Sequence, residues 1–429
     1  MILQIYSNKR SNRLDYILNF IFAEVLGIEY VLISSIPEID HSKALLNYST
    51  DKFKNSFQIV PHSLLFETEI KEQDISIEDN FFFFKTNGQS LEFDVFASSF
   101  YMLSRYEEYL SLELDSHGRY RAEESLAFKN NFLDKAVVNR WVLLLKTKLK
   151  KQYPELLFKP TKYSYLSTID IDNAFAFKAK GFIRLWGGFI KALLRNDFSD
   201  LKNRFAYVFL AKKDAFDVYD ELEDWHQKYK IRTLFFFLVG NNGVYDRNID
   251  INKRAYQTLI EKWSQKVEIG LHPSYNSNSS ISILRKELES INNIIKVPVT
   301  RSRQHFLKLS FPNTYKSLLK VGVKEDYTMG FASQIGFRAG VCTPFYWFDL
   351  EDNIQTKLKI IPFQIMDGTL NDYLKRTPEE AVEIIKKINQ EVREVEGLFC
   401  TLWHNESLSK MRQWEKWKPV YEKLLQIAK

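Results

Sequence analysis

The chain has 429 residues, of which 45% are apolar and 27% are charged, and this globular composition excludes a disordered chain. The formal net charge of +6 is small for this length and no compact basic module is present, so nucleic acid binding is not expected. Two cysteines, Cys342 and Cys400, cannot form a disulfide scaffold, and both are interpreted as small buried apolar residues.

Residues 1–95 are predicted to form a small α/β domain of unknown role. Ser11 is suited to the N-cap of an amphipathic helix that ends near Gly27. Residues 57–66 have the composition of a strand, and Pro61 favours an edge position because proline cannot donate to a neighbouring strand. This part of the chain contains no motif to which chemistry can be attached.

The chain begins without the basic region and apolar run that form a signal peptide. Residues 17–33 are largely apolar, but Glu24 and Glu29 interrupt them, which indicates a helix followed by a strand rather than a membrane span. We therefore expect a cytoplasmic protein.

Residues 96–158 are predicted to be a helical connecting region, and Pro154 and Pro160 place a domain boundary at its end. Over residues 159–429 strand and helix patterns alternate, which predicts parallel strands with helices outside, in a barrel or an open doubly wound sheet. Strands are expected at 163–171, 234–240, 267–272 and 398–403, and helices at 214–228, 253–265, 377–394 and 418–428.

In folds of this kind, reactive groups lie just past the carboxyl ends of the strands. Polar residues occur at four such ends, and three of the seven histidines of the chain are among them. This clustering is the strongest functional signal in the sequence. The four strand ends are residues 168–173, 272–277, 301–305 and 402–405.

Asp170 and Asp172 stand two residues apart on a predicted strand, so both can point toward the same end of the fold. A divalent metal at Asp172 would relieve the repulsion between the two carboxylates and leave Asp170 as a base. The alternative is that the pair caps a helix or closes a turn. His272 is either a metal ligand or a buried hydrogen-bonded histidine, and His404 is a candidate acid–base group.

The ordered series of these motifs resembles the polysaccharide deacetylases, carbohydrate esterase family 4, which contain the NodB homology domain. Residues 168–172 resemble the first motif of that family, and His272 stands where its histidine motif begins. Arg303 stands where its motif arginine occurs, and residues 402–404 match its final motif. The resemblance covers about residues 163–429.

The resemblance implies an α/β fold in which residues 159–429 form a catalytic, distorted (β/α)7-type barrel. The smaller α/β and helical N-terminal region precedes this barrel. That region resembles an uncharacterised domain found before such deacetylase domains in some bacterial proteins, and this resemblance assigns it no activity.

The resemblance also implies a role for each motif residue. Asp170 would be the general base, and Asp172 and His272 would be metal ligands. Arg303 would pair with Asp170 and keep it ionised. His404 would be the general acid that protonates the leaving amine.

Further residues are expected around this centre. Asp367 is the first candidate for the acid that orients His404, and Asp326 is the second. A backbone N–H near Phe306 is expected to hold the oxyanion together with the metal, and Leu402 to line the acetyl pocket.

The chain departs from the family pattern at one metal ligand. The family usually has a second histidine four residues after the first, and this chain has Asn276 there. Asparagine is a poor ligand for zinc, so we expect His305 to supply the third ligand and the divalent metal to be Zn²⁺. The alternative is a site that is weak in metal or inactive.

Three other features are less specific. Arg338 lies in a glycine- and aromatic-containing loop, residues 336–348, that faces either a substrate or a packed core, and Trp403 is expected to contact substrate. Residues 178–213 are basic and aromatic, which suits either peripheral contact with an anionic membrane or an insertion packed on the barrel.

The sequence therefore predicts a metal-dependent N-deacetylase that hydrolyses the acetamide of an amino-sugar glycan or glycan precursor. Two alternatives stay open. One is a non-catalytic carbohydrate-binding barrel that has lost its metal site, and the other is a related amidase with a small non-sugar substrate.

Overall fold

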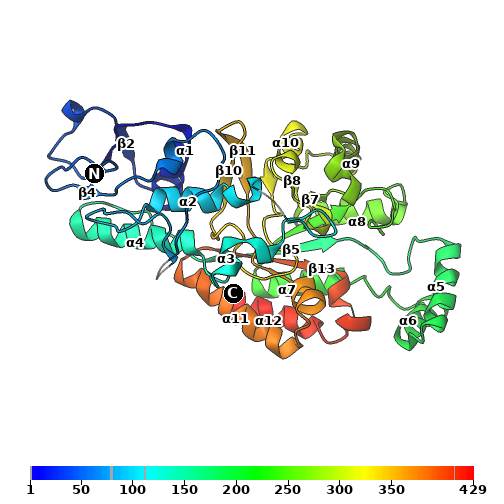
Figure 1. Ribbon diagram of the computed structural model, residues 1–429. Coiled ribbons are helices and arrows are strands. Elements are labelled where there is room, and N and C mark those ends of the chain that lie inside the picture. The colour runs from blue at the N-terminus through cyan, green and yellow to red at the C-terminus, as the bar shows by residue number, and fades with distance from the viewer. Residues whose placement is uncertain (1, 78–80, 111–112, 410) are drawn as a thin grey trace.

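Two β-sheets organise the protein, and helices surround them (Figure 1). The computed structural model describes residues 2–77, 81–110, 113–409 and 411–429, without the side chains of 182–185, 199 and 412. The smaller sheet has the strand order β2-β1-β3-β4, and the larger sheet has the order β10-β11-β9-β8-β7-β6-β5-β13-β12. The strands are β1 (Leu3–Tyr6), β2 (Tyr30–Ile33), β3 (Leu45–Asn47), β4 (Phe57–Gln58), β5 (Ser164–Ile171), β6 (Arg232–Leu238), β7 (Glu268–His272), β8 (Arg301–Ser302), β9 (Glu325–Asp326), β10 (Phe345–Asp349), β11 (Ile354–Ile360), β12 (Ile365–Met366) and β13 (Leu398–His404).

The helices of residues 159–429 follow the sequence pattern closely. The four that were expected are present as α7, α8, α11 and α12, and Thr377 and Glu380 form the capping box that begins α11. Within the described residues, none of the helices combines the length and apolar character needed to cross a bilayer. The α-helices are α1 (Asn12–Leu18), α2 (Val95–Leu103), α3 (Leu126–Lys129), α4 (Val137–Gln152), α5 (Phe182–Leu194), α6 (Phe198–Phe209), α7 (Tyr219–Tyr229), α8 (Arg254–Ser264), α9 (Ile281–Ile295), α10 (Asn313–Lys320), α11 (Pro378–Glu394) and α12 (Lys418–Ala428).

The first helix begins where the sequence predicts. The Ser11 hydroxyl accepts the Leu14 N–H at 3.0 Å, which satisfies one of the amides that the first turn leaves unpaired. The helical path continues through a π-helical segment, Asn19–Val25, and ends before Gly27, which has φ +61°. Glycine is favoured there because this backbone conformation strains other residues.

The expected strand at residues 57–66 is only partly correct. β4 does lie at an edge of the smaller sheet, as Pro61 indicated. It is shorter than predicted, however, because Ser63–Phe66 form a 3-10 helix whose Leu64 N–H donates to the ring of His62. A proline followed by a capping side chain therefore ends the strand early.

The N-terminal region packs directly against the larger sheet. The Tyr16 hydroxyl donates to the carbonyl of Tyr346 at 2.8 Å, and the Tyr16 ring lies 5.1 Å from that of Phe348. Arg140 of α4 binds Glu391 of α11. These contacts fix the N-terminal region on β10 of the larger sheet and on α11.

The larger sheet is parallel except for β10, which pairs antiparallel with β11. Its side chains alternate between two hydrophobic clusters. Ile169 and Phe235 face the main core, whereas Leu166 and Phe236 face a second, smaller cluster on the inner side of the sheet. Gly270 makes room for this inner cluster, since a Cβ there would lie 2.3 Å from the Phe236 ring.

The inner cluster shows how strongly the sheet curves. It joins side chains of β5, β6 and β13 to Tyr327, which follows β9, and to Phe363. Residues 361–366 cross from one side to the other: the N–H of Phe363 donates to Met329 O at 3.1 Å, and β12 then pairs with β13. The architecture is an α/β fold with a curved mixed sheet. Cys400 lies in the inner cluster and Cys342 in the main core, both buried and unpaired as expected.

Candidate metal centre

The candidate site lies at the carboxyl ends of the parallel strands. Asp170 belongs to the end of β5 and Asp172 follows that strand, His272 and His404 end β7 and β13, and Arg303 follows β8. Pro273 stops β7 directly after its histidine because it cannot continue the ladder. Parallel strands present their carboxyl ends at one edge, which explains why residues so far apart in sequence meet.

Asp172, His272 and His305 form one three-residue cluster. Each offers one potential metal-binding atom, and these atoms lie within 4.8 Å of one another. The Nε2 atom of His272 is 3.1 Å from Asp172 Oδ1, and that of His305 is 3.4 Å from Asp172 Oδ2. The structure thus brings together the three residues expected to bind a metal, including His305.

The donor set fits a divalent metal in two further respects. The Nδ1–H of His272 donates to the carbonyl of Arg303, and the Nδ1–H of His305 donates to Asp246 at 2.8 Å. In each ring an acceptor thus holds Nδ1 and Nε2 faces the cluster, which is how metal-binding histidines are commonly oriented. The buried Oδ1 of Asp172 has no hydrogen-bond partner. Two imidazoles and one carboxylate suit Zn²⁺.

Asp246 is a part of this centre that sequence reasoning missed. It is buried, it accepts a hydrogen bond from His305, and it also accepts the backbone N–H of Tyr275 at 2.9 Å. It lies in the polar loop after β6, a strand end that was not included among the candidates. A search of every strand end for acids would have found it.

Asp170 has the partner that was expected for a general base. Arg303 Nη1 donates to Asp170 Oδ1 at 2.9 Å and to the Thr168 hydroxyl at 2.7 Å. The other carboxylate oxygen, Oδ2, lies 3.6 Å from Nε2 of His272. One oxygen of Asp170 is thus held by a buried cation, while the other faces the metal cluster.

His404 also faces Asp172 and is oriented by Asp367. The His404 ring donates from Nδ1 to Asp367 Oδ1 at 2.8 Å, and its backbone N–H donates to Oδ2 at 2.8 Å. The Nε2 atom of His404 is 3.8 Å from Asp172 Oδ2. Asp326 instead accepts hydrogen bonds from Ser302 and Thr328.

The charges of the site shift the pKa values of its members. Burial raises the pKa of Asp172, but the positive charges of His305 and His404 outweigh this and hold that pKa well below its ordinary value. Burial lowers the pKa of His305, but Asp172 and Asp246 raise it to about 9. Burial likewise lowers the pKa of His404, and Asp367 reverses this and raises it well above its ordinary value. His404 is therefore cationic at neutral pH and able to donate a proton.

These residues line a cavity of about 260 Å³. Leu402 and Phe306 are part of its wall. Phe306 has φ 59°, a left-handed conformation that is uncommon for a bulky residue and that occurs where the surrounding structure imposes it. The wall also includes Arg119, Gln304, Leu307, Ala332, Met366, Gly368, Asp372 and Tyr373.

Arg119 is a second contributor that sequence reasoning missed, and it comes from the N-terminal region. Its guanidinium donates to the carbonyl of Phe306 at 2.8 Å, to Asp115 at 2.6 Å and to the Tyr373 hydroxyl at 3.3 Å. It thereby ties the loop before α3 to the strained backbone at the cavity wall. The only local signal was a polar loop between two helical stretches.

One expected substrate contact is wrong. Trp403 packs in the main core, with its ring 5.0 Å from that of Tyr421, because its neighbours Leu402 and His404 occupy the inner face of β13. Arg338 is buried and its guanidinium binds Glu108 at 2.5 Å, and it lines a neighbouring cavity that shares Arg119 and Tyr373 with this one.

Asn276, the residue at the usual position of the second family histidine, is exposed and takes no part in the cluster. In the substrate-facing loop expected at residues 336–348, Phe345 and Trp347 are buried in the main core. The interpretation of that loop as a turn into packed aromatics is therefore the correct one.

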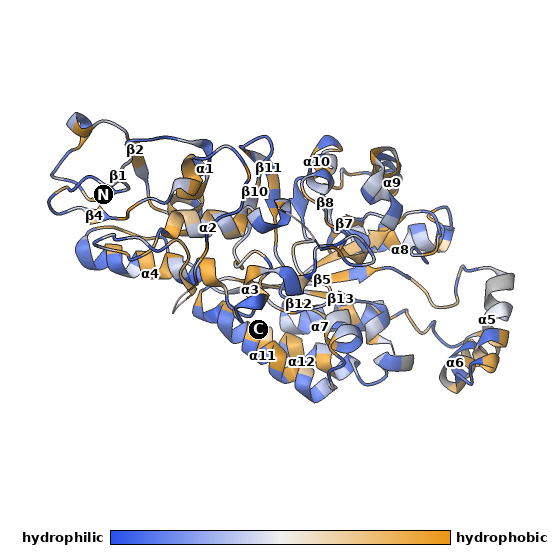
Figure 2. Ribbon diagram, viewed as in Figure 1, coloured by the Kyte–Doolittle hydropathy of each residue, from blue (hydrophilic) through white to orange (hydrophobic). Residues whose placement is uncertain are grey.

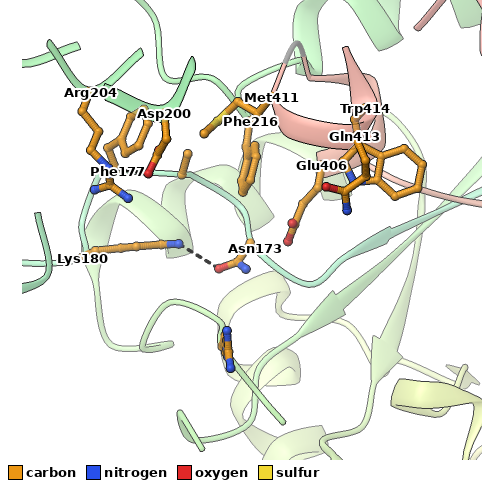
Figure 3. A pocket seen from close by; sticks show the side chains of 12 residues that line it. Asn173, Phe177, Lys180, Asp200, Arg204, Phe216, Glu406, Met411, Gln413 and Trp414 are labelled. Carbon is orange, nitrogen blue, oxygen red and sulfur yellow. Dashed lines mark hydrogen bonds and ion pairs between the residues drawn. The ribbon is translucent and has the colours of Figure 1, made fainter. Parts of the chain in front are cut away.

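A second cavity of about 250 Å³ begins at Asn173, the residue after Asp172 (Figure 3). The amine of Lys180 donates to Asn173 Oδ1 at 3.0 Å, and Glu406 lies across from them. Burial and the nearby Asp172 raise the pKa of Glu406. Among the described residues, this cavity holds no three-residue set of metal ligands.

Comparison with known proteins assigns no activity to the chain. A family model described as a family of unknown function, DUF7033, matches residues 3–154, which include Arg119. No curated protein matches the chain. A function for this chain is therefore inferred from the arrangement of the residues around Asp172.

Several solved structures share a weak overall likeness with this chain. The Puue allantoinase is 9% identical, with 62% of this chain and 83% of that chain covered and a TM-score of 0.39. The polysaccharide deacetylase Bc1974 from Bacillus cereus is 12% identical, with 62% and 88% covered and a TM-score of 0.29. The CE4 family pseudoenzyme BA3943 from Bacillus anthracis is 11% identical, with 62% of each chain covered and a TM-score of 0.30.

Proposed function

We propose that this protein is a metal-dependent hydrolase that removes N-acetyl groups from an amino-sugar glycan or glycan precursor. The observation that carries the proposal is the arrangement around Asp172. His272 and His305 converge on it, Asp170 flanks it with a buried arginine behind, and His404 faces it with an orienting carboxylate. A metal site between a base and an acid is the equipment that amide hydrolysis requires.

Asp172, His272 and His305 would hold the metal, which supplies a Lewis acid and lowers the pKa of a water molecule when bound. Asp170 accepts the proton of the attacking water, and Arg303 Nη1 holds the carboxylate in place by donating a hydrogen bond to Oδ1.

His404 then donates its proton to the nitrogen of the leaving amine. This step is necessary because an amine anion is a very poor leaving group. Asp367 fixes the ring so that Nε2 faces the cavity, and the carboxylate favours the protonated form. The backbone N–H of Phe306 is the proposed donor to the oxyanion, and Leu402 the proposed contact of the acetyl methyl group.

A sugar substrate is supported by the aromatic groups beside the cavity. The rings of Tyr245 and Tyr275 stack at 4.2 Å, and that of Phe306 lies 5.5 Å from each of them. Tyr373, a half-exposed side chain, lines the cavity itself. Aromatic faces of this kind can stack on the apolar faces of pyranose rings.

We also propose that residues 354–366 act as one bent strand that closes the larger sheet into a distorted seven-stranded barrel. The support is that this segment pairs with β9 at Lys359 and Ile360, and with β13 at Ile365 and Met366. A crystal structure in which residues 361–366 leave either neighbour would contradict this closure.

The proposed function is tested by measuring metal content and acetate release together. Purified protein is expected to bind about one Zn²⁺ per chain and to release acetate from N-acetylglucosamine oligomers, and Asp172→Ala and His272→Ala should lose both properties. Asn276→Ala, an exposed neighbour, is the matched control and should keep both.

Two results would contradict the proposal. If wild type and both ligand variants bind zinc equally weakly, these residues do not form a metal site, and a non-catalytic barrel is favoured. If the metal binds but no N-acetylated sugar releases acetate, the hydrolase has another substrate class.

A further inference from the structure

The helical hairpin formed by α5 and α6 projects from the body of the protein (Figure 1). The two helices pack on each other, and neither forms an extensive contact with another element. The base of the hairpin is fixed, because Asp214 accepts the backbone N–H groups of Ala176, Phe177 and Lys178. The hairpin is thus a well-anchored element, and among the described residues no other helix or strand packs extensively on its outer faces.

These outer faces are unusually apolar. Among the described residues, 21 large hydrophobic side chains are exposed, and eight of them lie between positions 186 and 210. Leu194 is 79% exposed and Phe198 is 72% exposed. Hydrophobic residues on α6 appear orange in Figure 2. The eight residues are Trp186, Ile190, Leu193, Leu194, Phe198, Phe205, Phe209 and Leu210.

Helical spacing places these side chains in stripes. On α5 they recur at intervals of three or four residues, so they share one face of the helix. The rings of Trp186 and Phe209 lie 6.4 Å apart, so the apolar stripes of the two helices adjoin. A contiguous exposed apolar surface of this kind marks an interaction site, whereas single exposed residues do not.

The charge of the chain is concentrated in the same segment. Residues 178–213 contain nine Lys or Arg and two Asp, a net charge of +7. Since the whole chain carries +6, all the other residues together carry −1. Lys191, Arg195 and Lys202 are exposed beside the apolar stripes. The occupant of this surface is therefore expected to be both apolar and anionic.

We propose that the α5–α6 hairpin binds the surface of an anionic lipid bilayer. Its exposed apolar side chains enter the boundary between headgroups and acyl chains, and its lysines and arginines bind lipid phosphates. The hairpin lies on the bilayer and does not cross it, because α5 has 13 residues and α6 has 12. A second copy of the hairpin is a poorer occupant, since two segments of charge +7 repel each other.

The test uses the full-length protein, without added metal or substrate, in sedimentation with lipid vesicles. Binding to vesicles of phosphatidylcholine mixed with phosphatidylglycerol should exceed binding to phosphatidylcholine alone by about tenfold or more, and salt should weaken it. The double variant Leu194→Asp/Phe198→Asp should bind the anionic vesicles at least about tenfold more weakly than wild type. Because neither metal nor substrate is present, the result is independent of the proposed hydrolase activity.

Leu157→Asp/Val297→Asp is the matched control, because these side chains are 76% and 58% exposed and lie outside the hairpin. It should bind anionic vesicles like wild type, and circular dichroism should show that both double variants are folded. Absence of wild-type binding, or equal loss in both variants, would overturn the proposal. So would a wild-type dimer that the hairpin variant converts to a monomer without any vesicle binding, since the surface would then serve self-association.

Discussion

Both sheets of this protein have polar side chains at the carboxyl ends of their strands, but the hydrogen bonding of these side chains differs between the two sheets. At the carboxyl edge of the smaller sheet, Asn47 donates to the carbonyl of Asp51 at 2.6 Å and accepts from the Ser49 hydroxyl at 2.7 Å. Gln58 donates to the same carbonyl of Asp51 at 2.9 Å. These polar groups satisfy one another, so this edge is a closed hydrogen-bond network that holds loops together.

The larger sheet leaves polar atoms directed at a common point. His272, His305 and His404 each commit Nδ1 to a fixed acceptor, so Nε2 of each ring is left facing Asp172. The buried Oδ1 of Asp172 lacks a hydrogen-bond partner. Buried polar atoms normally have hydrogen-bond partners, so an unpartnered Asp172 Oδ1 among three histidine rings distinguishes this edge from the smaller sheet's edge, where the polar groups satisfy one another.

If the edge of the larger sheet performs the chemistry, the largest loss of activity is expected on substitution of Asp170. Asp170→Asn removes the proton acceptor but keeps the size of the side chain, so acetate release should fall by about 10²–10⁴-fold while zinc content is unchanged. Activity is measured by an enzymatic acetate assay and zinc by elemental analysis. Turnover near the wild-type rate would show that another group is the base.

The next effect concerns the acceptor that holds a metal ligand. Asp246→Ala should lower zinc affinity by about 10–100-fold, because the ring of His305 loses the partner that fixes Nε2 toward the metal. Competition with a chromogenic chelator measures the affinity. Asp250→Ala, an exposed acid in the same loop, is the control, and an equal loss in both variants would contradict the assigned role of Asp246.

A smaller effect is expected where the two regions meet. Arg119→Ala removes the donor to Phe306 O, and because a hydrogen bond from a charged group contributes about 1.5–3 kcal/mol, kcat/KM should fall by about tenfold or more. Zinc content should not change. Arg121→Ala, an exposed neighbour whose guanidinium binds Glu113, should retain wild-type kinetics. Unchanged kinetics in the Arg119 variant would restrict the N-terminal region to a structural role.

Substitution within the hydrogen-bond network at the edge of the smaller sheet should lower stability without changing activity. Gln58→Ala removes the side-chain donor to the carbonyl of Ser49 and one of the two side-chain donors to the carbonyl of Asp51, which should lower the free energy of unfolding by about 1–3 kcal/mol. Urea denaturation measures this change. Activity per folded molecule and zinc content should equal those of wild type, and a loss of either would mean that the smaller sheet takes part in the chemistry.

Much of the site could be recognised in advance because its residue types follow strand patterns. Asp170, Asp172, His272 and His404 all stand at the ends of β5, β7 and β13, and each lies at the cavity. The same alternation that places Leu402 and His404 inward also requires Trp403 to face outward, so that error was avoidable.

The other misses were not avoidable in this way. The ion pair between Arg338 and Glu108 joins residues 230 positions apart, and the bond from Arg119 to Phe306 spans 187 positions. Nothing in the local sequence around either arginine indicates its partner. Such contacts follow only from the packing of the N-terminal region on the larger sheet.

The amino-acid sequence by itself determined where the strands and helices lie in residues 159–429, and which strand ends contain acids, histidines and an arginine. Local steric preferences and the burial of alternating side chains are sufficient for that. The sequence already favoured His305 over Asn276 as the third member of the cluster, whereas only the tertiary structure showed that Asp246 holds His305 and that an N-terminal arginine reaches the cavity. These outcomes depend on the curvature of the sheet and on domain packing, which bring together residues that no short-range interaction connects.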